Sequence, residues 1–206
     1  MNAWTSLMRI RLQMAFLSLM ACQSSPTIHG QQIGTFTFSA VPVSSDCQNF
    51  VAIPPIGADG GFTFDAILSR DPASTQAFMW VGNVERDAGF DGQIFSSEAS
   101  APRHFIECGT SCDTVPVVET IRVVLLSSSQ DSALGGSCPP NPLDGGVPVA
   151  TPDGGISPPC PTADPCDVVR ACGELIDVVS PDGGSCQCGA CTLFSTVEGQ
   201  RKASTP

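Results

Sequence analysis

The chain has 206 residues, with nine Lys and Arg against twenty Asp and Glu and a formal net charge of −11. This balance excludes nucleic acid as an expected partner, because phosphate contacts need clustered basic side chains. Twenty glycines, eighteen prolines and no tyrosine indicate a turn-rich chain of one domain, with or without a small appendage.

Residues 1–21 have the composition of a secretory signal. They contain Arg9 and Arg11 and no acidic residue, and the run from Leu12 to Met20 is mostly apolar. This run is far shorter than the ~20 apolar residues that span a bilayer. A basic start followed by a short apolar run predicts a cleaved signal peptide. The remaining chain would carry seven basic and twenty acidic residues.

The four residues Leu19-Met20-Ala21-Cys22 resemble the lipobox of bacterial lipoproteins. The resemblance implies cleavage between Ala21 and Cys22, a diacylglycerol on the Cys22 thiol and an acyl chain on its new amine. Two or more chains hold a protein stably on a membrane. Gln23 stands where Asp would favour the inner membrane, so the resemblance implies the outer membrane of a Gram-negative envelope, on either face. The alternative is a buried apolar helix that contains one cysteine.

Residues 22–32 are polar and without pattern, which predicts a flexible tether. From residue 33 to 128 the pattern is that of β-strands. Phe36, Phe38 and Ala40 alternate with polar residues, and Val115 to Ser127 is the strongest strand, expected in the centre of a sheet. Other strand candidates are 62–66, 77–84, 92–97 and 103–108. We therefore predict a mainly β chain whose residues 33–128 form an antiparallel β-sandwich, immunoglobulin-like or jelly-roll-like.

Residues 129–165 hold nine of the eighteen prolines and several Gly-Gly pairs, which predicts a long loop or linker. Asp144-Gly145-Gly146 and Asp153-Gly154-Gly155 are near-repeats that could ligate calcium. A surface loop is the favoured interpretation, because calcium takes six to eight oxygens and each repeat offers one carboxylate.

Residues 166–206 form a cysteine-rich C-terminal segment that is either separate or completes the β domain. We expect a short helix over 165–172 and then a hairpin around Pro181–Gly184. Cys172-Gly173, Gly183-Gly184 and Cys188-Gly189-Ala190-Cys191 resemble a short disulfide module of secreted and lipid-anchored proteins of Gram-negative soil bacteria. In that family the module is structural or adhesive. Here Cys186 follows the double glycine, whereas the family's cysteine precedes it.

Ten cysteines remain besides Cys22. They are Cys47, Cys108, Cys112, Cys138, Cys160, Cys166, Cys172, Cys186, Cys188 and Cys191. An even number outside the cytoplasm predicts disulfides, whose pairing cannot be derived from sequence. A Cys108–Cys112 bridge would staple a tight loop. A zinc site at Cys108 and Cys112, or at Cys186, Cys188 and Cys191, is the less favoured alternative.

The sequence offers no catalytic motif. We interpret His29 as a solvated tether residue and His104, four residues before Cys108, as an ordinary strand residue. We expect no metal and no cofactor beyond the lipid. The favoured function is a lipid-anchored envelope protein with a non-catalytic structural or recognition role, whose partner is an envelope or extracellular protein or glycan. The alternatives are a surface enzyme or thiol-redox protein using Cys188 and Cys191, and calcium-dependent adhesion.

Overall fold

The computed structural model describes residues 27–47, 61–103, 115–144, 160, 166–180 and 189–203. Short helices α1 (Ser128–Ala133) and η2 (Pro142–Asp144, a 3-10 turn) follow the sixth strand. The strands are β1 (Gln31–Ser45), β2 (Phe62–Arg70), β3 (Gln76–Val81), β4 (Val84–Phe90), β5 (Ile94–Arg103), β6 (Val115–Ser127), β7 (Val168–Val179) and β8 (Cys191–Arg201).

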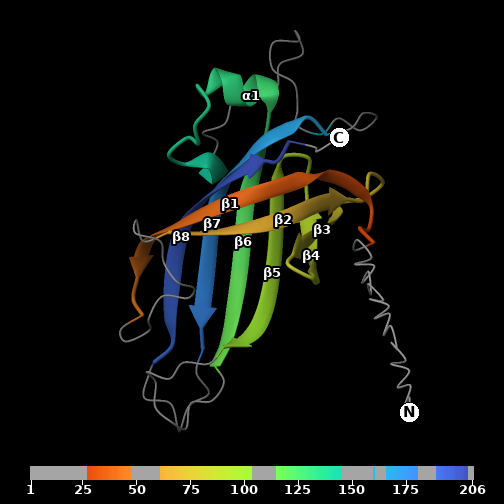
Figure 1. Cartoon of the computed structure of the whole chain (residues 1–206). Coiled ribbons are helices and arrows are strands. Elements are labelled where there is room, and N and C mark those ends of the chain that lie inside the picture. Colours follow the sequence, from red (N-terminus) through yellow and green to blue (C-terminus); the bar gives the residue numbers. More distant parts are fainter. Residues whose placement is uncertain are drawn as a thin grey trace, which may run out of the picture.

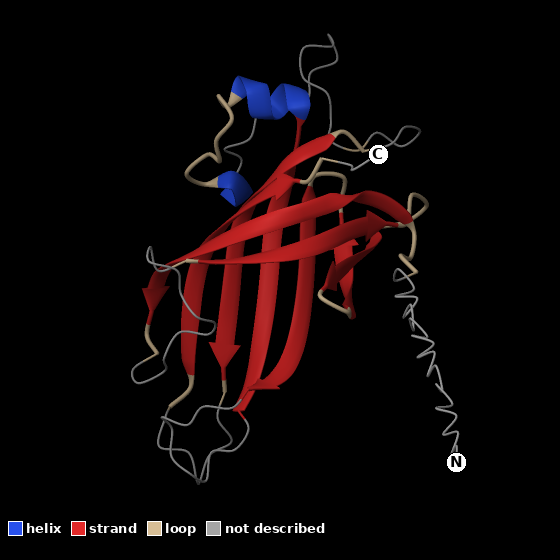
Figure 2. Ribbon diagram, viewed as in Figure 1, coloured by secondary structure: helices blue, strands red, loops and turns tan. Residues whose placement is uncertain are grey.

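The eight strands form one closed barrel (Figure 1). Each strand pairs antiparallel with the next, and β8 pairs with β1 from Phe36↔Arg201 to Ser45↔Leu193. In Figure 2, β1 and β2 cross the long strands β5 to β8 at a steep angle. The prediction of a mainly β chain is confirmed. The predicted sandwich, immunoglobulin-like or jelly-roll-like, is wrong, because the last strand, β8, pairs with the first, β1, and closes the sheet of the described residues into a barrel.

The C-terminal segment supplies two strands of this barrel. The predicted helix over 165–172 is wrong, because β7 begins at Val168 and pairs with β6 on one side and β8 on the other. Apolar residues at Val169, Cys172, Ile176 and Val179 fit a helical spacing. Pairing to two neighbouring strands outweighs that local preference.

The strand predicted over 77–84 is a hairpin. Strand β3 ends at Val81 and β4 begins at Val84, with Gly82 at a φ of 61° in the turn. A two-residue turn of this kind needs a left-handed conformation, which Gly adopts readily. The strand predicted over 115–127 is confirmed with its bounds, and β6 has a paired strand on each side.

The barrel interior is filled with side chains. Alternate residues of each strand point inward, and the largest fully buried ones include Phe36, Phe38, Phe95, Leu68 and Met79. Eight strands enclose a space that such side chains can fill. A second, smaller cluster lies on the outer side of the wall. There Val124 and Leu126 of β6 are covered by Leu134 and Leu143 of the α1–η2 segment. Among the described residues, no helix is long and apolar enough to cross a bilayer.

Candidate functional site

All six cysteines of the described residues are in disulfides. Cys47 bonds to Cys191, Cys138 to Cys172 and Cys160 to Cys166. The other predicted site residues lie outside the described residues: Ala21, Cys22, His104, Cys108, Cys112, Cys186 and Cys188. The disulfide-rich prediction is therefore confirmed for the described part of the chain.

The Cys47–Cys191 bond fastens the seam between the first and last strands. It joins the residues just past the end of β1 and at the start of β8. Asp46 lies beside it, and its carboxylate accepts a hydrogen bond from the Thr192 backbone N–H at 2.5 Å. Donor atoms of Asp46, Cys47 and Cys191 lie within 4.8 Å of one another. Because both sulfurs are in a disulfide, they offer no thiolate to a metal.

The Cys138–Cys172 bond holds the α1–η2 segment on the outer wall. Cys172 is fully buried on β7, and Cys138 packs against it within the smaller apolar cluster. A charged network fixes the same segment, since Arg170 donates to Asp131 of α1 at 2.5 Å and also pairs with Glu198 of β8. These carboxylates, Asp131 first, raise the pKa of Arg170 above its usual range.

The Cys160–Cys166 bond packs against one end of the barrel. Both cysteines belong to the main core cluster with Ile33 and Val168. Two arginines donate to backbone carbonyls of this link: Arg70 to Cys160 at 3.4 Å, and Arg201 to Cys166 at 3.4 Å. The guanidinium groups thus satisfy carbonyls that would otherwise be buried without a donor.

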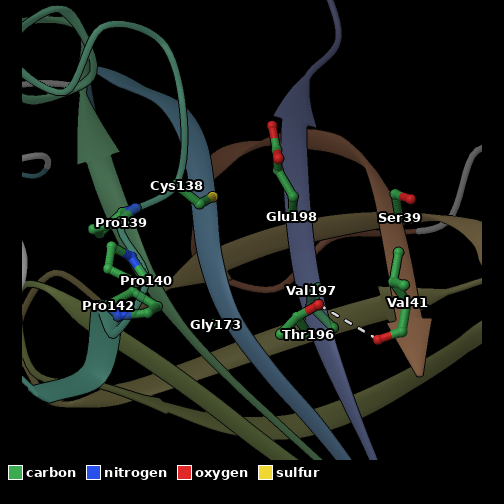
Figure 3. Close-up of a pocket in the computed structure, with 10 residues that line it drawn as sticks. All are labelled: Ser39, Val41, Cys138, Pro139, Pro140, Pro142, Gly173, Thr196, Val197 and Glu198. Carbon is green, nitrogen blue, oxygen red and sulfur yellow. Dashed lines mark hydrogen bonds between the residues drawn. The ribbon is translucent and has the colours of Figure 1, made fainter. Parts of the chain in front are cut away.

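A groove runs along the outer wall beside the α1–η2 segment (Figure 3). One side is formed by the prolines of Cys138–Pro142, and the other by outward residues of β1 and β8, among them Val41 and Thr196. Its volume is about 200 Å³, below the usual range of small-molecule pockets. Proline offers no N–H donor, so the groove suits one apolar side chain of a partner better than a polar substrate.

A wider hollow lies where β4 and β5 separate. These strands pair only from Ala88↔Ser97 to Phe90↔Phe95. The hollow has a volume of about 480 Å³ and is lined by Asp87, Ala88, Gly89, Ser96, Ser97, Glu98, Thr120 and Arg122. Its hydroxyl and carboxylate groups are suited to a polar ligand.

Two acidic residues point into the barrel, where an apolar face was expected. Glu119 of β6 lies directly opposite Asp177 of β7 and forms an ion pair with Arg86 of β4. The side chain of Arg86 is 18% exposed and that of Glu119 26%. This pair ties β4 to β6 where β4 does not pair with β5. The sequence carried one signal for this ion pair, because Glu119 interrupts the apolar face of Val117 and Ile121.

Asp65 gives a prediction for pH dependence. The Lys202 ammonium at 2.7 Å and the Thr37 hydroxyl at 2.8 Å donate to its carboxylate and lower the pKa of Asp65. The ionised Asp65 carboxylate therefore stabilises the folded chain at neutral pH, and this contribution is lost as the pH falls below about 4. Both charged partners are exposed, so the effect on stability is small. Lys202→Gln should raise the pKa of Asp65, which a carboxyl NMR titration measures; an unchanged pKa would show that Lys202 does not act on it.

Comparison with known proteins gives no relative from which a role can be transferred: no family model, no curated protein and no solved structure matches the chain.

Proposed function

We propose that this chain is a lipid-anchored envelope protein with a non-catalytic structural or recognition role. The observation that carries the proposal is the bonding of Cys191 to Cys47. The thiol-redox alternative requires Cys191 to pair with Cys188, and a sulfur held in a structural disulfide is not available for exchange. The sequence motif at Cys22 supports the anchor.

The rigidity of the wall supports a role in recognition. The α1–η2 segment is fastened by the Cys138–Cys172 disulfide and by Arg170, so the groove beside it has a preformed shape. A preformed surface loses little conformational entropy when a partner binds. The partner proposed is an envelope or extracellular protein or glycan, and the membrane is reached through the lipid.

The anchor is tested with Cys22→Ser. In cells fed a labelled fatty acid, the variant should lose the label and move from the membrane fraction to the soluble fraction. Ser24→Ala, two residues further on, is the matched control and should keep both the label and the membrane location. A Cys22→Ser protein that is still acylated would refute the anchor.

The non-catalytic role is tested separately by counting thiols. A thiol reagent added to the unfolded, unreduced protein should find no free thiol among the ten cysteines that follow Cys22. A reactive thiol at Cys188 would instead favour the redox alternative.

A further inference from the structure

His29, in the short described stretch 27–30 that precedes β1, contacts the β3–β4 hairpin. The His29 ring packs on Phe78, with ring centroids 5.5 Å apart and planes at 54°. Its Nδ1 is 2.6 Å from Oε1 of Glu85. The His29 side chain is 62% exposed, in agreement with the prediction of a solvated residue, and it also contacts the outer face of the β3–β4 hairpin.

The same face holds most of the unsatisfied polar atoms of the described chain. Four buried side-chain atoms of the described residues have no hydrogen-bond partner, and three of them are Ser69 Oγ, Trp80 Nε1 and Glu85 Oε2. Trp80 lies directly opposite Glu85, and Ser69 directly opposite Phe78. Because Leu68, Ala77 and Met79 fill the core, these residues all point to the outer side of the wall.

The chemistry of these atoms defines what would satisfy them. Trp80 offers an N–H donor, Glu85 an acceptor and Ser69 a hydroxyl that can do either. They stand beside two aromatic rings, Phe78 and Trp80, which are neighbours on one face of β3. A matching ligand needs an apolar face for the rings and several groups that both donate and accept. A saccharide ring, with its C–H face and neighbouring hydroxyls, has both properties.

Other small ligands match less well. An anion would meet the carboxylates of Glu85 and Asp87 on this face. An organic cation would be attracted to the rings and to Glu85, but it has no acceptor for the Trp80 N–H and would leave that group unpaired.

We propose that the outer face formed by Ser69, Phe78, Trp80 and Glu85 is a saccharide-binding site, and that His29 occupies it in the absence of sugar. His29 reproduces two features of the ligand, a flat ring on Phe78 and a polar atom at Glu85, while Trp80 Nε1 stays unsatisfied. The 480 Å³ hollow begins at Asp87, the next outward residue of β4 after Glu85, and extends the site for a longer saccharide. This rests on the proposed role in recognition and names its ligand class.

Trp80 is also the reporter of the test. The chain has two tryptophans, Trp4 and Trp80. Trp4 lies in the predicted signal peptide, so Trp80 is the one that remains in the protein processed at Cys22. Emission of the processed protein is titrated with maltotetraose, cellotetraose and chitotetraose, and with tetramethylammonium chloride as the cation. At least one saccharide should give a saturable change. His29→Ala should tighten that binding several-fold, because removal of a competitor raises the binding-competent fraction.

Glu85→Gln should weaken the binding about tenfold, as expected for loss of a charged hydrogen bond. Asp144→Asn, which removes the same charge from an exposed position on η2, outside both the site and the hollow, should leave it unchanged. No response to any saccharide at ~10 mM in His29→Ala, equal binding by Glu85→Gln, or saturation by the cation alone would overturn the proposal. A protein that is acylated at Cys22 but fails this test would keep its proposed anchored role and lose only this site.

Discussion

Gly173→Ala should lower the free energy of unfolding by about 3 kcal/mol or more, as expected for forced overpacking of a buried position. Gly173 lies on β7 opposite Val123 of β6. A Cβ built there would be 1.9 Å from the carbonyl oxygen of Arg122 and 2.7 Å from Cα of Val123. Both are backbone atoms that no rotamer change can move, so β6 and β7 would have to separate. Urea denaturation measures the loss.

Two other strand glycines provide a graded comparison. At Gly89 the nearest atom to an added Cβ is Ser96 Oγ at 3.5 Å, so Gly89→Ala should change stability by no more than about 0.5 kcal/mol. At Gly199 the Cβ would meet the buried Phe38 ring at 2.5 Å, and a side chain can shift where a backbone cannot. Gly199→Ala should therefore fall between the two. Equal effects of Gly173→Ala and Gly89→Ala would contradict the close pairing of β6 and β7.

Removal of the seam disulfide should have a comparably large effect. The double variant Cys47→Ala/Cys191→Ala should lose about 5 kcal/mol by the chain-entropy relation, because the bond spans 144 residues. Cys138→Ala/Cys172→Ala, whose bond spans 34 residues, should lose about 1 kcal/mol less. Denaturation of both variants without reductant measures the order. A larger loss in Cys138→Ala/Cys172→Ala would show that the bond to the outer wall, and not the bond between the first and last strands, contributes more to stability.

Local patterns were enough to predict strands such as β1 and β6. The alternation over Val115 to Ser127 gave β6 with its bounds, because that strand has one face in the core for its whole length. The alternation of Phe36, Phe38 and Ala40 located β1 in the same way. Where both faces are apolar, as over 77–84, alternation is lost and the turn at Gly82 was not recognised.

Barrel closure could not be predicted from local patterns. It depends on pairs such as Phe36↔Arg201, and sequence periodicity carries no information on which distant strands meet. Residues 165–172 were predicted as a helix from their apolar spacing, and only the pairing with β6 and β8 shows that a strand begins there. The same holds for the disulfides, since any of ten cysteines could pair with any other.

The proposed saccharide site could not be predicted from the sequence for a different reason. Phe78 and Trp80 stand in an apolar run, and the sequence does not distinguish aromatic rings that face the core from rings that face outward. Ser69 and Glu85 can be recognised as parts of one site only when β2, β3 and β4 lie side by side. His29 reads as part of a polar tether until its contact with Glu85 is known.

We propose that the chain acts through a disulfide-fastened barrel and not through thiol chemistry. Peptide mapping of the unreduced protein by mass spectrometry distinguishes the two. We expect a cross-linked peptide that joins Cys47 to Cys191. A peptide that joins Cys188 to Cys191, or a free thiol at Cys191, would contradict it.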